Sequence, residues 1–121
     1  MKYDDNNIFA KILRGEIPCN KIYEDEFVLS FYDINPQKKI HALVIPKGKY
    51  IDLDDFSVNA SNEEIIGLMK GVTNVAKKLG ISSIDGKGYR ALANISDYGG
   101  QEVPHLHFHL FGGEKVGKMV S

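Results

Sequence analysis

Three of the four histidines in this 121-residue chain stand at positions 105, 107 and 109, in the stretch HLHFH. Alternate side chains of a β-strand point to the same face of the sheet, so His105, His107 and His109 are predicted to share one face. The apolar residues between them would face the core. A register slip by one residue would exchange the two faces, and the pattern therefore specifies the register strongly.

Three interpretations of this row compete. A solvent-exposed row would carry no chemistry. Two imidazoles at positions i and i+2 of a strand can both ligate Zn²⁺, although Glu102 is the only carboxylate close by in sequence and no cysteine is near. A neutral imidazole near pH 7 can also be a nucleophile, while its neighbours carry protons.

The loop that precedes the histidines favours catalysis on an anion. Its sequence, YGGQEV, places two glycines and the Gln101 amide directly before the row. Backbone N–H groups of such a loop, together with a side-chain amide, can hold phosphate oxygens. The pairs Gly99–Gly100 and Gly112–Gly113 bracket the histidines and allow close backbone approach or positive φ at both ends.

Periodicity and turn residues predict the elements that must position these side chains. The first is a short helix capped by Asn6 or Asn7 and stopped at Gly15, followed by two strands within 20–34 that are joined by a charged turn at 24–26. A buried strand over 40–46 and a long helix between Ser61 and Gly80 come next. A strand over 88–96 then leads to the histidine strand. Ser61 and Glu64 form a capping box. The predicted core face of the long helix is Ile65, Leu68, Met69, Val72, Val75, Ala76 and Leu79. Hairpin-like strands around one long helix predict an antiparallel α+β domain rather than a parallel βαβ fold.

Length and composition bound the function. A chain of 121 residues is expected to form a single domain over 1–121. With 15 basic and 16 acidic residues, it has no charge field that would gather nucleic acid or an anionic membrane. Cys19 is the only cysteine, which excludes an internal disulfide. No signal-like or membrane-spanning apolar run occurs, so we expect a cytoplasmic protein without nucleic-acid or membrane partners.

The segment HLHFHLF resembles the signature of the histidine triad (HIT) superfamily, in which histidines alternate with apolar residues. Further segments resemble the Hint-like, nucleotide-binding branch of that superfamily in the same order: IFAKILRGEIP, FYDINPQ, HALVIPK, NISDYGGQEV and HLFGG. The resemblance runs from about Asn6 to Gly113. It implies a HIT-like fold of about five antiparallel strands with one long and one short helix, and a homodimer across which the sheet is continuous.

The resemblance also implies an activity. The family's enzymes hydrolyse purine nucleoside phosphoramidates, such as AMP or GMP linked to an amine through a P–N bond, without a metal or other cofactor. His107 would attack the phosphorus and form a nucleotidyl-histidine, and His105 would assist its orientation. His109 would contact the phosphate and help the leaving amine, and His41 would support the triad. The alternative is a purine-nucleotide-binding regulatory or scaffold protein with incidental hydrolysis.

The nucleoside contacts of the family fall on further positions. Asp33 would bind the ribose hydroxyls. The base would lie between the apolar side chains of Phe9, Phe31, Ile34 and Ile12, each of which could equally belong to the core. The phosphate side would comprise Asn94, Gln101, Glu102 and the backbone N–H of Val103. Glu102 departs from the family, where a serine assists the leaving group, because an ionised carboxylate cannot donate a hydrogen bond. The tail EKVGKMVS also lacks the family's tryptophan-containing end.

Overall fold

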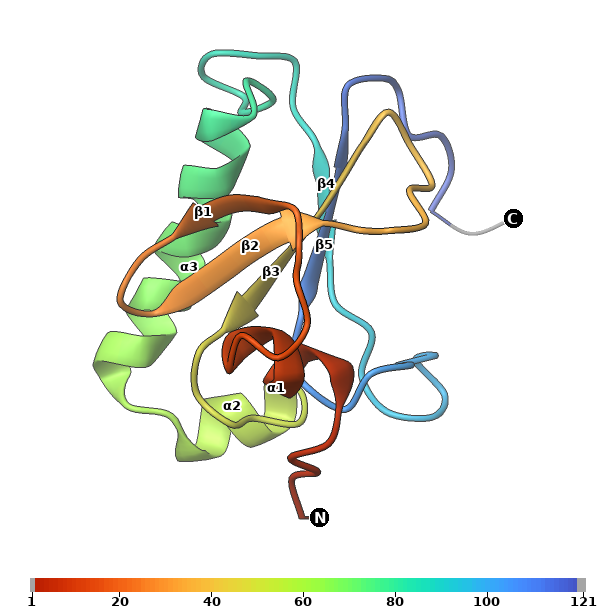
Figure 1. Ribbon diagram of the computed structural model, residues 1–121. Coiled ribbons are helices and arrows are strands. Elements are labelled where there is room, and N and C mark those ends of the chain that lie inside the picture. The colour runs from red at the N-terminus through yellow and green to blue at the C-terminus, as the bar shows by residue number, and fades with distance from the viewer. Residues whose placement is uncertain (1, 120–121) are drawn as a thin grey trace.

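The computed structural model describes residues 2–119, which form one five-stranded antiparallel sheet and three helices (Figure 1). The strands are β1 (Lys21–Glu24), β2 (Val28–Tyr32), β3 (Ile40–Pro46), β4 (Arg90–Leu92) and β5 (Phe108–Gly112). Their order across the sheet is β1-β2-β3-β5-β4, and every neighbouring pair is antiparallel. The predicted α+β class and antiparallel sheet are confirmed.

The predicted strand over 40–46 coincides with β3, the central strand of the sheet. Almost all of its residues are buried, because strands flank it on both edges and helices cover both faces. The β1–β2 hairpin also lies where the charged turn was predicted. There Asp25 accepts the backbone N–H groups of Phe27 and Val28 at 2.8 and 2.9 Å.

Two strand predictions were too long. The predicted strand over 88–96 is paired only at β4, and the histidine strand joins the sheet only from Phe108 onward. The backbone of residues 105 and 106 bonds outside the sheet: the His105 N–H donates to the Val103 carbonyl at 2.8 Å, and the Leu106 N–H donates to the Tyr50 carbonyl at 2.9 Å. The Pro46 carbonyl, at the end of β3, accepts a side-chain nitrogen of His105 at 2.9 Å instead of a strand N–H.

The short and the long helix begin where their caps predict. Asn7 caps α1 (Ile8–Leu13) by accepting the Ala10 N–H at 2.9 Å. Ser61 and Glu64 form the predicted capping box of α3 (Asn62–Lys78). A further helix of seven residues, α2 (Leu53–Asn59), was not predicted from the sequence. Its N-cap is Asp52, so the DLDDF segment carried a capping signal, but a single buried side chain in the helix is too little for a periodicity.

The two faces of the sheet are covered by different helices (Figure 1). α3 packs on the face that carries the even-numbered residues Val28, Ala42, Val44, Leu106 and Leu110. α1 packs through Phe9 on the face that carries Leu29, Phe31, Leu43 and Ile45. The predicted core face of α3 is confirmed for six residues, four of them buried and two partly buried against the same core: Leu68, Val72, Val75, Ala76, Ile65 and Leu79. Met69 was placed there wrongly, since it lies on the outer side of the helix and is 68% exposed.

This parity determines where the histidines lie. Residues 41, 107 and 109 are odd-numbered; the ring of His107 contacts Phe9 and the ring of His109 on the α1 side of the sheet. The site is therefore built on the face opposite the long helix. None of the helices in residues 2–119 is long and apolar enough to cross a membrane.

Candidate active site

Two neighbouring strands bring His41 and His109 together. In the β3–β5 register His109 pairs with Leu43, one diagonal step from His41. The two rings lie 5.2 Å apart, and His41 Nε2 is 2.9 Å from His109 Nδ1. Asp33 joins them because its N–H donates to the His41 carbonyl at 3.0 Å and continues the β2–β3 ladder. Its Oδ2 lies 3.5 Å from His41 Nε2.

His107 is held by the backbone of the residue two positions earlier. Its Nδ1 lies 2.7 Å from the His105 carbonyl oxygen, and a carbonyl can only accept, so Nδ1 carries the proton. Nε2 is then the unprotonated nitrogen with a free lone pair. The ring is buried against Phe9, with centroids 4.9 Å apart, and lies 5.1 Å from the ring of His109.

The backbone carbonyl of His105 orients His107, as the resemblance implies for this position, while the side chain of His105 bonds elsewhere. It makes no hydrogen bond to the His107 ring and is fully buried, at 0% exposure. Its Nε2 donates to the Pro46 carbonyl at 2.9 Å, and its Nδ1 accepts the Tyr3 hydroxyl at 2.6 Å. Burial of His105 and His107, two of the three histidines in the row, rules out the interpretation of the row as solvent-exposed.

Burial also determines the charge of the site. It lowers the pKa of His105 and of His109 to about 4 in each case. Burial lowers the pKa of His107 and His41 as well, while nearby carboxylates such as Asp33 partly oppose the shift. An imidazole in such surroundings loses its proton more readily, because the cation is poorly solvated. All four rings are therefore neutral at pH 7, which is the form a nucleophile requires.

The hydrogen bonds further specify where each proton lies. The Gln37 N–H donates to His41 Nδ1 at 3.2 Å, so the proton of His41 is on Nε2 and is directed at His109 Nδ1. His109 then carries its own proton on Nε2. That atom is buried and has no hydrogen-bond partner among the described residues. A buried unpaired donor costs roughly 1–3 kcal/mol, and an oxygen of a bound phosphate would satisfy it.

Asp33, His41 and His109 are spaced closely enough to surround a metal ion, because one nitrogen or oxygen of each lies within 4.8 Å of the others. A histidine that ligates through one nitrogen usually donates its other N–H to an acceptor. At His41 the other nitrogen, Nδ1, accepts the Gln37 N–H. The proton of the ring is therefore on Nε2, and a protonated Nε2 cannot ligate a metal ion. The pair His105 and His107 is not a ligand set either, because His105 has both ring nitrogens occupied.

The glycine-containing loop at residues 96–103 forms most of its hydrogen bonds internally. The side-chain amide of Gln101 donates to the carbonyls of Ile51 and Val103 at 2.7 and 3.0 Å, and its oxygen accepts the Ser96 N–H at 2.9 Å. The N–H groups of Gly100 and Gln101 close turns within the loop. Ser96 has a φ of 59°, which is uncommon for a residue with a side chain. The predicted phosphate cradle is therefore not open at Gln101, because these donors hold the loop in shape.

The other predicted phosphate-side residues lie around this loop. The Val103 N–H has no hydrogen-bond partner within residues 2–119. Glu102 is exposed, next to Val103. Asn94 is half-buried in the segment that follows β4. The roles of Val103, Glu102 and Asn94 towards a phosphate stay predictions.

The predicted base-binding residues separate into two groups. Phe9 and Phe31 are buried in the core under α1, with ring centroids 5.6 Å apart. Ile34 is 88% exposed, just beyond β2. Ile12 borders a hollow of about 500 Å³ on the α1 side, which Leu13, Ile17, Cys19 and Leu29 also line. Ile17 and Cys19 were not expected there, because the irregular segment after α1 has no periodicity to indicate which side chains face inward.

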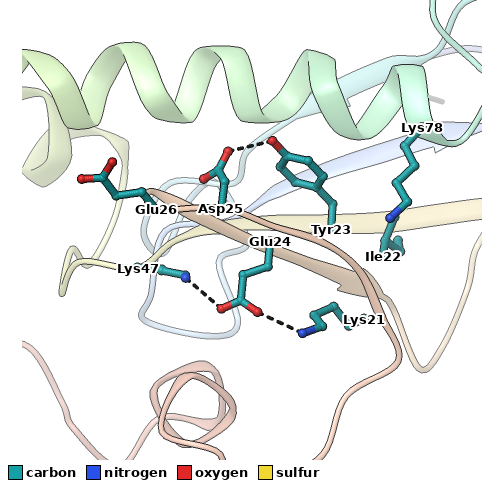
Figure 2. A pocket seen from close by; sticks show the side chains of 8 residues that line it. All are labelled: Lys21, Ile22, Tyr23, Glu24, Asp25, Glu26, Lys47 and Lys78. Carbon is teal, nitrogen blue, oxygen red and sulfur yellow. Dashed lines mark hydrogen bonds and ion pairs between the residues drawn. The ribbon is translucent and has the colours of Figure 1, made fainter.

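A second hollow, of about 670 Å³, lies along β1 and is lined by charged residues (Figure 2). Glu24 pairs with Lys21 at 3.0 Å and with Lys47 at 2.8 Å, and Tyr23 donates to Asp25 at 2.8 Å. These charges neutralise one another. None of the predicted site residues lines this hollow, so it is not part of the histidine site.

Three supporting residues were missed by sequence reasoning: Tyr3, Gln37 and Pro46. Each bonds a histidine ring nitrogen, and Tyr3 lies 102 positions away from its partner in sequence. Two of the three contacts use backbone groups, which nearly every sequence position offers alike. No local pattern identifies them.

Comparison with known proteins matches residues 14–116 to the HIT domain. An uncharacterized 13.2 kDa HIT-like protein of Azospirillum brasilense is 53% identical over 119 residues, which cover 98% of this chain and 95% of that protein. A purine nucleoside phosphoramidase of Escherichia coli is 40% identical over 117 residues, with coverages of 97% and 95%. Among solved structures, a HIT family hydrolase from Clostridium thermocellum is similar with a TM-score of 0.84 at 39% identity, covering 98% of this chain and 99% of that one.

Proposed function

The chain belongs to the HIT domain family, and from this premise we propose that it hydrolyses the P–N bond of purine nucleoside phosphoramidates. Hydrolase activity is supported by the HIT family hydrolase that it resembles in structure, and the substrate class by the Escherichia coli phosphoramidase. The observation that carries the proposal is the hydrogen bond from His107 Nδ1 to the His105 carbonyl. It leaves Nε2 of a neutral imidazole as the free nucleophilic atom.

In the first step, His107 Nε2 forms a bond to the α-phosphorus while the P–N bond breaks. The leaving nitrogen takes up a proton from solvent and departs as an amine. The imidazole becomes a nucleotidyl-imidazolium, whose Nδ1–H donates to the His105 carbonyl, the partner that lies 2.7 Å away in the ligand-free protein. That bond strengthens as the ring gains positive charge, so it stabilises the transition state more than the ground state.

Nearby donors stabilise the charge on the phosphoryl oxygens. The Nε2–H of His109 and the Val103 N–H are two donors that have no hydrogen-bond partner among the described residues. The His41 Nε2–H donates to His109 Nδ1. His109 Nδ1 is therefore an acceptor, and the proton of His109 stays on Nε2, where it can be donated to a ligand. Losing one such preorganised donor in other hydrolases costs about 10²–10³-fold in rate.

In the second step, water attacks the phosphorus and the nucleotide leaves His107. The bond from water oxygen to phosphorus forms while the Nε2–P bond breaks, and water releases the proton that the first step consumed. The products are the nucleoside monophosphate, the amine and the free enzyme. Both steps use the chain's own side chains, and the proposal includes no cofactor.

For the nucleoside, Asp33 supports a ribose site. Its Oδ1 accepts the Asn35 N–H at 2.8 Å, and carboxylate lone pairs remain for hydroxyl groups. We propose that the base lies over the α1 side near Ile12 and Ile34, with Phe9 and Phe31 as the buried layer beneath. The homodimer and a cytoplasmic location, both expected from the sequence, stay predictions.

The test is His107→Ala with an adenosine phosphoramidate as substrate. Turnover should fall by roughly 10³-fold or more, because the attacking atom is lost. AMP affinity, measured by calorimetry, should change little. Ser57→Ala, an exposed position on α2, serves as the control and should behave like the wild type. Full activity of His107→Ala would refute the mechanism, and negligible wild-type turnover with intact AMP binding would favour the scaffold function instead.

A further inference from the structure

We propose that Tyr3 is a positioning residue for the nucleophile, acting through the buried ring of His105. The inference rests on the proposed function for its catalytic consequence, but its geometry is independent of the substrate. Tyr3 lies in the N-terminal segment before α1 and touches neither His107 nor any predicted nucleotide contact through a hydrogen bond. Its effect must therefore pass through His105.

The tautomer of His105 is fixed by its two partners. The Pro46 carbonyl, 2.9 Å from Nε2, can only accept, so Nε2 carries the proton. Nδ1 is then an acceptor, and the Tyr3 hydroxyl donates to it at 2.6 Å. The ring is at 0% exposure. No solvent is in contact with it, and Tyr3 is the partner that satisfies Nδ1.

The ring of His105 is coupled to the nucleophile through its own backbone. Tyr3 bonds the side chain of His105, and the backbone carbonyl of the same residue accepts His107 Nδ1–H at 2.7 Å. The His105 N–H in turn donates to the Val103 carbonyl at 2.8 Å. Residue 105 is thus held at the ring, at the amide and at the carbonyl. A shift of the ring moves the carbonyl that orients His107.

The segment that carries Tyr3 is itself held from outside the site. Lys49 pairs with Asp5 at 2.8 Å, and Arg14 donates to the Asp5 carbonyl at 2.8 Å. The side-chain amide of Asn7 donates to the Asp4 carbonyl at 2.7 Å. These contacts keep the N-terminal segment on the protein when only the Tyr3 hydroxyl is removed. Tyr3→Phe therefore tests the hydrogen bond rather than the attachment of the segment.

Tyr3→Phe leaves a buried acceptor without a donor. The ring of His105 is then held by the Pro46 bond alone, and small displacements of the nucleophile slow the chemical step strongly. Nucleotide binding should persist, because Tyr3 makes no hydrogen bond to a predicted nucleotide contact. We expect kcat for an adenosine phosphoramidate to fall about 10-fold, with KM within about two-fold of the wild type.

The matched control is Tyr23→Phe. Tyr23 is also half-buried, and its hydroxyl donates to Asp25 at 2.8 Å in the hollow along β1, apart from the triad. The Tyr23→Phe variant also loses a hydrogen bond donated by a tyrosine hydroxyl, but it should leave kcat unchanged. An equal fall of kcat in both variants would overturn the proposal, because it would show a general effect of lost stability.

A second measurement separates this inference from the proposed function. ¹⁵N NMR of the histidine rings, with and without AMP, reports the tautomer and pKa of His105 and His107. In Tyr3→Phe the ring signals of both residues should shift, whereas Tyr23→Phe should leave them in place. Unchanged His107 signals in Tyr3→Phe refute the positioning role, whatever the activity. A wild type without phosphoramidase activity refutes the proposed function, while the NMR result still decides on Tyr3.

Discussion

At the scale of single residues, four side chains of one type perform different tasks because their ring nitrogens meet different partners. His105 lies between a hydroxyl and a carbonyl, and His107 donates to a carbonyl and keeps one nitrogen free. His41 accepts from a backbone N–H and directs its own proton towards His109. The identity of each partner, donor or acceptor, determines which nitrogen can attack and which can donate.

The buried histidines predict that stability depends on pH. Burial lowers the pKa of His105 from 6.5 to about 4 in the folded state, so the unfolded chain binds the proton more readily. The free energy of unfolding is therefore not reduced by this residue above pH 6.5. It falls as the pH drops from 6.5 towards 4, by roughly 3 kcal/mol for His105. His109, with its pKa also lowered to about 4 by burial, adds in the same direction.

Urea unfolding between pH 4.5 and 7.5 measures this effect. His105→Asn should be less stable at pH 7 but should show a shallower decline towards acid than the wild type, because one titrating group is gone. Ser57→Ala should keep the wild-type slope. A decline of equal steepness in His105→Asn would show that other groups are responsible.

At the scale of elements, α3 approaches the sheet closely through two glycines. A Cβ on Gly71 would lie 2.8 Å from Val28 Cγ2 and 2.9 Å from Cγ1, and one on Gly67 would lie 2.4 Å from the Phe27 ring. Val28 is completely buried, so its side chain cannot turn away into solvent. Glycine in a helix is intrinsically unfavourable, so the close packing explains its presence at these two positions.

Gly71→Ala should consequently destabilise the fold. The substitution gains about 1 kcal/mol of helix propensity, but overpacking typically costs about 1–3 kcal/mol. Thr73→Ala, on the exposed side of the same helix, gains propensity without a clash and should be neutral or slightly stabilising. Urea midpoints of the two variants decide the matter. A Gly71→Ala midpoint at or above that of the wild type would show that the helix can move away.

At the scale of the whole molecule, the two faces of the sheet have separate tasks. α3 closes the larger core on one face, while the histidines and α1 occupy the other. The outer side of α3 is apolar at Ile66, 55% exposed, and at Met69. Such residues on a surface helix are suited to contact a second subunit, in line with the proposed homodimer.

Light scattering tests the proposed dimer. The expected mass is about twice the 13.5 kDa of one chain. Met69→Glu places a charge on the apolar side of α3 and should shift the protein towards the monomer. Ser57→Glu, on the exposed side of α2, should leave the mass unchanged. A wild-type monomer at micromolar concentration would contradict the proposal.

Much of the architecture was predictable because its causes are local. The bounds of β3, the caps at Asn7 and Ser61, and the alternation of histidines with apolar residues all follow from neighbours within a few positions. Strand ends were less predictable. Whether His105 and His107 pair in the sheet depends on what the Tyr50 and Pro46 carbonyls bind, and those groups lie far away in the sequence.

The sequence by itself determined that three imidazoles alternate with apolar residues and that a loop with two glycines precedes them. Only the tertiary structure decided which nitrogen of each ring carries the proton, that Gln101 is committed to its own loop, and that Asp33 and Tyr3 reach the histidines. The physical reason is the range of the interactions. Periodicity arises from adjacent residues, whereas the partner of a buried ring nitrogen is chosen by how distant segments pack.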